Sequence, residues 1–299
     1  DIGKGYLTSL SRENNIDEFI SFSANIEGYG STSTSFVGAG ITDFDFYTAV
    51  DLWFTDQAQA ESTYGLIGDW NVSAVTNMTS AFYPSRGGGS VINTFNEDIS
   101  SWDTSSVLNM GNMFYQASAF NQPLNWDVSS VTNMSGMFTY ATSFDQPLNW
   151  NTSSVTNMNG MFTYATSFDQ PLNWDVSSVT NMFQMFTYAT SFNSTLNFSD
   201  TSSVTDMQYM FRNATAFNQP LNLDVSSVTN MQGMFYEATS FNSTLIFDTS
   251  SVTIMRWMFR NATAFNQPLN LDVSSVTTMF QMFLNITLST TNYDLILVY

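Results

Sequence analysis

Hydrophobic residues recur along this chain at a nearly constant interval. A valine in a short Ser-x-Val motif marks the register, at Val75, Val107, Val131, Val155, Val179, Val204, Val228, Val252 and Val276. The first interval is the longest, and the later ones are all close to one another in length. A fixed period of roughly 24 residues is typical of a solenoid, in which each repeat forms one coil and buries its apolar face only against neighbouring coils. The pattern therefore predicts a solenoid of about nine coils.

Within one repeat, the apolar positions predict the core of a coil. In the third repeat they are Val131, Met134, Met137, Phe138, Ala141, Phe144, Leu148 and Trp150, and similar residues fill the same positions in the other repeats. The β-prone segment Val-Thr-Asn-Met predicts a short strand that pairs with the same strand of the next coil. The segment Met-Phe-x-x-Ala-Thr predicts one helical or 3₁₀ turn.

Two polar segments predict the corners of each coil. Asn-Gln-Pro-Leu turns the chain, because proline fixes φ and cannot donate a backbone hydrogen bond. In Trp-Asp-Val-Ser-Ser, the Asp or Asn side chain is expected to accept a hydrogen bond from its own turn backbone. The asparagines of the predicted strands should stack as a ladder and bond the turn backbone; they are Asn109, Asn133, Asn157, Asn181 and Asn230.

Equivalent positions of successive repeats are called columns below. The residues in these columns resemble the BspA-type leucine-rich repeat of surface proteins, in the variant that occurs in mycoplasma surface lipoproteins. The resemblance rests on WDVSSVTNMSGMF at Trp126–Phe138 and on its copies between about residues 70 and 284. The upstream segment Ala49–Met78 is similar to the lead-in helix that such repeats often carry. The resemblance implies an LRR-like β-solenoid and an extracellular or cell-surface location. It implies no catalytic or binding residue, because this family has no agreed activity.

The sequence divides into four segments. Residues 1–42 are rich in Ser, Thr and Gly and predict an extended N-terminal arm. Residues 43–69 predict a capping helix and lead-in, because the apolar residues of Asp43–Ala60 have helical spacing. Residues 70–287 are the repeat solenoid, and residues 288–299 are a C-terminal strand or tail.

The tail ends in an apolar, β-prone run formed by Leu295, Ile296, Leu297, Val298 and Tyr299. Two interpretations are open: a final strand that closes the solenoid, or a strand that pairs with a neighbouring subunit. The end of a solenoid is an open sheet edge that natural proteins normally cover. If the arm or the tail crosses to the next molecule, the contact is head-to-tail and does not close, which builds a filament.

Composition excludes several classes of function. The chain has 25 Asp and Glu against 6 Lys and Arg, for a net charge of −19, so phosphate backbones and anionic membranes would repel it. The absence of Cys and His excludes disulfides, thiolate metal sites and His-dependent catalytic triads. No apolar run approaches the length of a transmembrane helix, so no membrane insertion is expected. We expect neither an enzyme nor a cofactor.

Stacked polar columns are the remaining candidates for chemistry. One column holds Asp103, Asp127, Asp175, Asp224, Asp248 and Asp272, and another holds Asp145 and Asp169. A glycosidase-like acid–base pair or a structural Ca²⁺ site is one interpretation of these columns, but turn capping is favoured because Asn fills the same columns in other repeats. Tyr140, Tyr164 and Tyr188 form another column, interpreted as a lateral packing surface or as a carbohydrate-stacking strip.

Several Asn-x-Ser/Thr sequons fall in turns or in variable columns, where N-linked glycans would be accommodated if the source is eukaryotic. The candidate sites are Asn71, Asn151, Asn193, Asn197, Asn213, Asn242, Asn261 and Asn285. The favoured function is an extracellular structural protein, a glycosylated subunit that polymerises with itself head-to-tail into a fibre. The alternative is a monomeric cell-surface adhesin or ligand-binding module. A polysaccharide-acting enzyme has weaker support.

Overall fold

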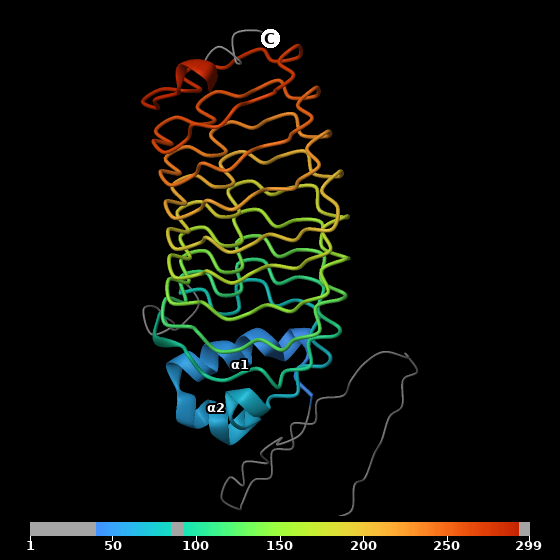
Figure 1. Ribbon diagram of the computed structural model, residues 1–299. Coiled ribbons are helices and arrows are strands. Elements are labelled where there is room, and N and C mark those ends of the chain that lie inside the picture. Colours follow the sequence, from blue (N-terminus) through green and yellow to red (C-terminus); the bar gives the residue numbers. More distant parts are fainter. Residues whose placement is uncertain (1–39, 85–92, 293–299) are drawn as a thin grey trace, which may run out of the picture. The chain divides into compact units, whose positions relative to one another are not determined.

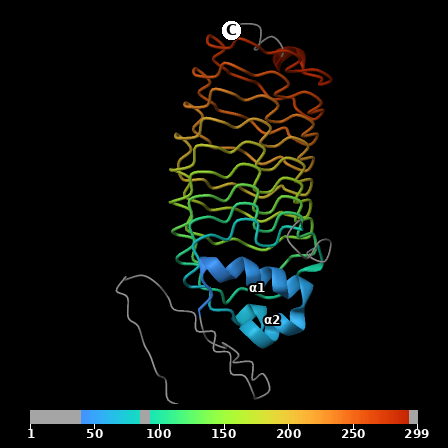
Figure 2. The ribbon, with the colours of Figure 1, turned by 180° about the vertical axis from the view of Figure 1, so that it is seen from behind.

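The computed structural model describes residues 40–84 and 93–292. Most of the predicted N-terminal arm and all of the apolar run from Leu295 to Tyr299 therefore lie outside the described residues. The described elements begin with helix α1 (Asp43–Thr55), helix α2 (Gln57–Tyr64) and the 3₁₀ helix η1 (Ile67–Asp69). The repeats follow, one coil above another (Figures 1 and 2).

Helix α1 lies against the first coil, as the predicted capping helix should (Figure 1). It buries Phe46, Ala49, Val50 and Trp53. The carboxylate of Asp43 accepts hydrogen bonds from the backbone of the first coil, at 2.8 Å from the amide of Thr76 and 3.1 Å from that of Asn77. The apolar face and the polar N-terminus of α1 thus both hold it on the first coil.

The single helix predicted over Asp43–Ala60 is divided at Asp56. Its φ of −151° and ψ of 82° are not helical. The Asp56 side chain accepts a hydrogen bond from the amide of Gln59 at 3.0 Å, which caps the N-terminus of α2. The acidic residue therefore ends one helix and starts the next.

Successive coils are joined by isolated parallel β-bridges between equivalent residues. One column of bridges runs from Asn77 through Asn109, Asn133, Asn157, Asn181, Asp206, Asn230 and Ile254 to Thr278. The predicted pairing of each repeat with the next is confirmed, but the described residues contain single bridges and no extended strand. The physical reason is that a turn begins directly after the bridge residue: the amide of Met137 donates to the carbonyl of Met134 at 3.3 Å.

The predicted helical turn is instead a series of β-turns. In the third repeat the amides of Met137, Thr139 and Ala141 each donate to the carbonyl three residues earlier. The third residues of two of these turns, Gly136 and Tyr140, have φ of 62° and 60°, which is the sign that a type II turn requires at this position. The left-handed residues prevent a helix from continuing.

The predicted core is confirmed, because all eight apolar positions of the third repeat are buried. Their rings form ladders along the stack. Phe138 lies 5.5 Å from Phe114 and 5.6 Å from Phe162, centroid to centroid, with nearly parallel planes. Phe144 packs 4.1 Å from Phe138 within the same coil. The identical segments Met137–Trp150 and Met161–Trp174 are therefore two successive layers of one aromatic core.

A buried column three residues before the anchor valine alternates between valine and threonine. Val128, Thr152 and Val176 illustrate the pattern, and all three are at most 1% exposed. The Thr152 hydroxyl donates to the carbonyl of Asp175 in the next coil at 2.7 Å, and Thr104, Thr201 and Thr249 make the equivalent bond. The stack thus has a period of two coils as well as of one.

Candidate functional site

One face of the coil stack differs from coil to coil, whereas most other positions are nearly constant. The variable positions are the fourth, fifth, eighth and ninth residues after each anchor valine, and we call them the variable face. At the eighth position, for example, the chain places Tyr115, Thr139, Arg212, Tyr236 and Arg260. The sixth and seventh positions between them hold Met and Phe in nearly every coil. Folding does not require one particular residue on the variable face, so its residues are free to serve another role.

The fifth and ninth positions have a left-handed backbone. The fifth position has φ between 53° and 62° in each coil, and the ninth has φ between 55° and 61° in each coil after the first. This conformation costs an L-residue about 1–2 kcal/mol, whereas glycine adopts it readily. Gly136, Gly160 and Gly233 fill the fifth position in three coils, but Tyr209 and Trp257 fill it in two others. Every coil shares this backbone, so what distinguishes Tyr209 and Trp257 is the large aromatic side chain that each places at the fifth position.

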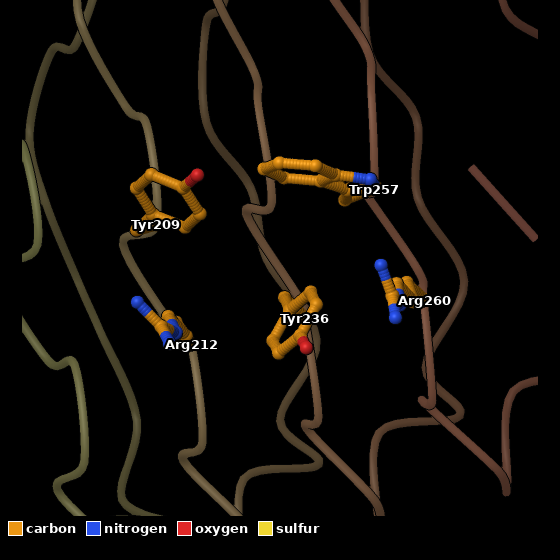
Figure 3. A pocket seen from close by; sticks show the side chains of 5 residues that line it. All are labelled: Tyr209, Arg212, Tyr236, Trp257 and Arg260. Carbon is orange, nitrogen blue, oxygen red and sulfur yellow. The ribbon is translucent and has the colours of Figure 1, made fainter. Parts of the chain in front are cut away.

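Five side chains from three successive coils surround a cavity of about 140 Å³ on the variable face (Figure 3). They are Tyr209, Arg212, Tyr236, Trp257 and Arg260, and we call the site the aromatic–arginine cup. Gly233 occupies the fifth position of the coil between those of Tyr209 and Trp257. A methyl group on Gly233 would overlap the ring of Tyr209, so the glycine lets this ring lie across the neighbouring coil.

The arginines of the cup contact aromatic rings. The guanidinium carbon of Arg212 lies 5.3 Å from the ring centroid of Tyr236, and that of Arg260 lies 5.6 Å from the same centroid. Tyr236 therefore sits between two cations (Figure 3). Next to the cup, Arg256 lies 4.0 Å from the Trp257 ring centroid. Cation–π contacts of this kind contribute about 0.5–1 kcal/mol at exposed sites.

Much of the hydrogen-bonding capacity of this site is unused. Within the described residues, none of the three guanidinium groups forms an ion pair with a carboxylate, and Arg260 donates to the side-chain oxygen of Gln281 at 2.9 Å. The Nε atoms of Arg212, Arg256 and Arg260 and the Nε1 atom of Trp257 are buried without a hydrogen-bond partner in the described part of the chain. Such unpaired donors are unfavourable unless something bonds them. Because these atoms have almost no exposed surface, a ligand could bond them only after the side chains shift.

A carboxylate beside the cup is held by amides. Asn213 donates from Nδ2 to one oxygen of Glu237 at 2.5 Å, and Asn261 donates to the other at 3.1 Å. Burial alone would raise the pKa of Glu237, but these bonds, the bond from Tyr236 and the charge of Arg212 outweigh it and hold the pKa below its ordinary value. Glu237 is therefore ionised at neutral pH, yet its two oxygens are already bonded by neighbouring coils.

The predicted tyrosine column is present but its rings are not free. The Tyr140 and Tyr164 centroids are 4.5 Å apart, and those of Tyr164 and Tyr188 are 4.3 Å apart, with nearly parallel planes. Within this stack the ring faces cover one another, and Arg212 lies 5.7 Å from the centroid of Tyr188. The geometry agrees better with packing along the stack than with a strip of open faces for sugars.

The predicted capping role of the aspartate column is confirmed. Asp103, Asp127 and Asp224 each accept a hydrogen bond from the amide two residues later, at 2.9–3.1 Å. Bonds from the side chain and backbone of the following serines lower the pKa of these carboxyl groups. Asn151 makes the same turn with the amide of Ser153 at 3.2 Å. The strand asparagines likewise bond the turn backbone; Asn133, for example, accepts from the amide of Ser135 at 3.0 Å and donates to Asn109 at 3.1 Å.

The sequon asparagines fall into two groups, according to whether Nδ2 donates a hydrogen bond to another residue. Nδ2 is the atom through which an N-linked glycan would be attached. Nδ2 donates to another side chain in Asn197, Asn213, Asn261 and Asn285. In Asn71, Asn151, Asn193 and Asn242 the side-chain oxygen accepts hydrogen bonds, from turn backbones among other donors, while Nδ2 bonds no other described residue. The second group is thus the better prepared for a glycan.

The sequence reasoning missed the cup, although the chain carries a signal for it. The segments Arg212–Thr229 and Arg260–Thr277 are identical and lie two repeats apart. This doubled interval places both arginines at the eighth position, with the coil of Gly233 and Tyr236 between them. The two-coil period seen in the buried threonines thus reappears at the surface.

Among the described residues, no helix has both the length and the apolar character that a membrane span would need. No curated protein matches the chain. The sequence does match the profile of a family described as "Mycoplasma protein of unknown function, DUF285", over residues 48–149, 124–223, 148–245 and 222–295. These overlapping segments run through the coils and include the cup, and they span most of the sequence. The chain therefore belongs to the DUF285 family of repeat-containing proteins.

Proposed function

We propose that this chain is an extracellular recognition module that binds its ligand through the variable face of a repeat scaffold. The observation that carries the proposal is the concentration of sequence differences on that face. Neighbouring coils share their core, corners and bridges, yet they differ at the fourth, fifth, eighth and ninth positions. Stacked repeats commonly use one surface of this kind for binding.

The aromatic–arginine cup is the centre of the proposed surface. It combines a cavity, aromatic walls, two cations and unpaired donors, which are the features expected of a binding site. The proposal includes an LRR-like β-solenoid of the BspA type, an extracellular location, and N-linked glycans at sequons such as Asn193 and Asn242. It assigns no catalytic residue.

A cup-less variant tests the proposal, using residues that other coils carry at the same positions. Its five substitutions are Tyr209→Gly, Arg212→Thr, Tyr236→Thr, Trp257→Gly and Arg260→Thr. The fold should tolerate the threonines, because Thr139 and Thr163 already occupy the eighth position and donate to carbonyls of the next coil at 2.8 and 2.7 Å. The matched control changes the same face away from the cup, with Tyr115→Thr and Tyr140→Gln.

The measurement is binding of the labelled chain to arrays of glycans and extracellular proteins. We expect at least one ligand that binds the wild type and the control alike and binds the cup-less variant at least tenfold more weakly. The proposal is wrong if no ligand binds the wild type, or if every ligand that binds the wild type binds the cup-less variant equally well. Circular dichroism must show that all three proteins are folded.

A second candidate function is a subunit that polymerises head-to-tail into a fibre. The observation that favours it is apolar surface on the last described coil, where Met279 is 46% exposed and Phe280 is 58% exposed. At the other end of the stack, α1 covers the first coil (Figure 1). A second copy, or the run from Leu295 to Tyr299 of a second copy, would bury this surface.

Negative-stain microscopy and light scattering test the fibre. We expect filaments of the purified chain, and their loss when residues 295–299 are deleted or when Met279→Gln and Phe280→Gln are introduced together. The variant Tyr140→Gln serves as a control that leaves the end of the stack unchanged. Monodisperse monomers at high protein concentration would exclude the fibre.

A further inference from the structure

We propose that the aromatic–arginine cup binds a single carboxylated sugar ring at the end of a glycan. This inference rests on the proposed recognition function and names the ligand class for the same face. Three properties of the cup support it: its size, its paired aromatic walls with unpaired donors, and the isolation of its positive charge.

The size of the cup fits one six-membered ring. Its volume of about 140 Å³ is close to that of the roughly 150 Å³ protein cavity that holds one benzene molecule. The coils that carry Tyr209 and Trp257 are two steps apart, or about 10 Å at the usual spacing between β-bridged chains. Gly233 contributes no side chain between them, and the ring of Tyr209 lies against this glycine, so the cavity is the space that remains between that ring and the other lining side chains.

The walls of the cup suit the two faces of a sugar. A pyranose presents C–H groups on its ring faces and oxygen atoms around its edge, and Tyr and Trp offer an apolar ring together with a polar group. The buried Nε1 of Trp257 and the Nε atoms of Arg212 and Arg260 have no partner among the described residues. These atoms have almost no exposed surface, so oxygens at the edge of the ring would bond the guanidinium groups of Arg212 and Arg260 from the cavity side and would reach the Nε atoms only after a shift of the side chains.

The charge of the cup selects a carboxylate. Arg212 and Arg260 line the cavity, and no acidic residue lines it. The guanidinium group is planar and binds a carboxylate through two parallel hydrogen bonds. Arg212 forms no ion pair within the described residues, and the nearby carboxylate of Glu237 is bonded by Asn213 and Asn261.

The rest of the chain favours a ligand with one charge over a polyanion. The arginines of the described residues are Arg212, Arg256 and Arg260, all within two coils of one another, whereas the whole chain carries a net charge of −19. At physiological salt, exposed charges act over about 8 Å. A polyuronate or nucleic acid leaving the cup would meet repulsion on both sides, but a neutral glycan with one terminal acid would not.

The test compares methyl β-D-glucuronide with methyl β-D-glucoside, which differ only in the carboxylate. Trp257 is a natural reporter, because the six other tryptophans are buried at 7% exposure or less and Trp257 is half-buried. We expect the glucuronide to change the tryptophan fluorescence and to protect it from acrylamide quenching. The glucoside should bind at least tenfold more weakly, and added salt should weaken only the glucuronide.

Variants identify the groups responsible, with calorimetry as the readout. Arg212→Thr with Arg260→Thr should remove the preference for the glucuronide, whereas Tyr140→Gln, outside the cup, should change nothing. Equal binding of the two sugars, or an unchanged preference in the double arginine variant, would overturn the inference. If neither sugar binds while the arrays yield another ligand that depends on the cup, the sugar assignment is wrong and the recognition function stands. If no ligand depends on the cup, both fail.

Discussion

The cup depends on a glycine, and replacing it gives a quantitative test of the geometry. Gly233 has φ of 59°, and a methyl group there would overlap the ring of Tyr209. Gly160 is a matched control in the same column, because it has φ of 62° and its methyl group would find its nearest atom, the hydroxyl oxygen of Thr163, at an acceptable 3.4 Å. Gly160→Ala therefore measures the backbone term alone, and Gly233→Ala measures that term together with the displacement of Tyr209.

The two substitutions should differ by an amount that the contacts of Tyr209 determine. An alanine in the left-handed conformation costs about 1–2 kcal/mol. At Gly233, the tyrosine ring must also move, which breaks its hydrogen bond with Gln232, worth about 1 kcal/mol. It also breaks the contact with Arg212 at 5.4 Å, worth about 0.5–1 kcal/mol. We expect a loss of about 1–2 kcal/mol for Gly160→Ala and, by adding these contributions, about 2.5–4 kcal/mol for Gly233→Ala.

The assay is urea unfolding followed by circular dichroism and by tryptophan fluorescence, with the two transitions required to coincide before free energies are compared. In a chain that also carries Tyr209→Gly, the cost of Gly233→Ala should fall to that of Gly160→Ala. The reasoning is refuted if the two alanine variants agree within about 0.5 kcal/mol, the usual error of such comparisons. It is also refuted if Tyr209→Gly leaves the cost of Gly233→Ala unchanged.

Three further predictions concern the scaffold. Thr152→Val should lower the free energy of unfolding by about 1–3 kcal/mol, because the buried hydroxyl bonds the carbonyl of Asp175 at 2.7 Å and its removal leaves that carbonyl unpaired; urea unfolding with a loss below about 0.5 kcal/mol would contradict this. Phe162→Ala should cost about 3–5 kcal/mol by the same measurement, because Phe162 is fully buried between the rings of Phe138 and Phe186. The pKa of Asp175 is lowered by hydrogen bonds from the backbone and side chain of Ser177. The contribution of Asp175 to stability is therefore complete above about pH 4 and is lost as the pH falls through the folded-state pKa. Asp175→Asn should reduce the acid dependence of the thermal midpoint, and an unchanged dependence would rule the mechanism out.

Much of the scaffold follows from the sequence because its forces are local or repeat with the period. The core positions, the capping of turns by Asp and the apolar face of α1 are each set by residues a few positions apart, and the fixed interval shows how coils align. The division at Asp56 was also within reach, since Asp followed three residues later by Gln is a capping pattern. Even the two-coil period can be read from the identical segments Arg212–Thr229 and Arg260–Thr277.

The sequence alone determined a stack of equivalent coils with a shared core, and the tertiary structure decided what lies on its surface. Tyr209 and Trp257 do not themselves signal a left-handed backbone, because such residues avoid it; the signal lies in Gly136, Gly160 and Gly233 at the same position of other coils. The predicted strand shrank to single bridges because a turn starts at Met134, directly after the bridge residue. The cup unites Tyr209, Tyr236 and Trp257, which come from three successive coils. Its cavity exists because stacking brings distant residues together over a glycine, and no local preference encodes that contact.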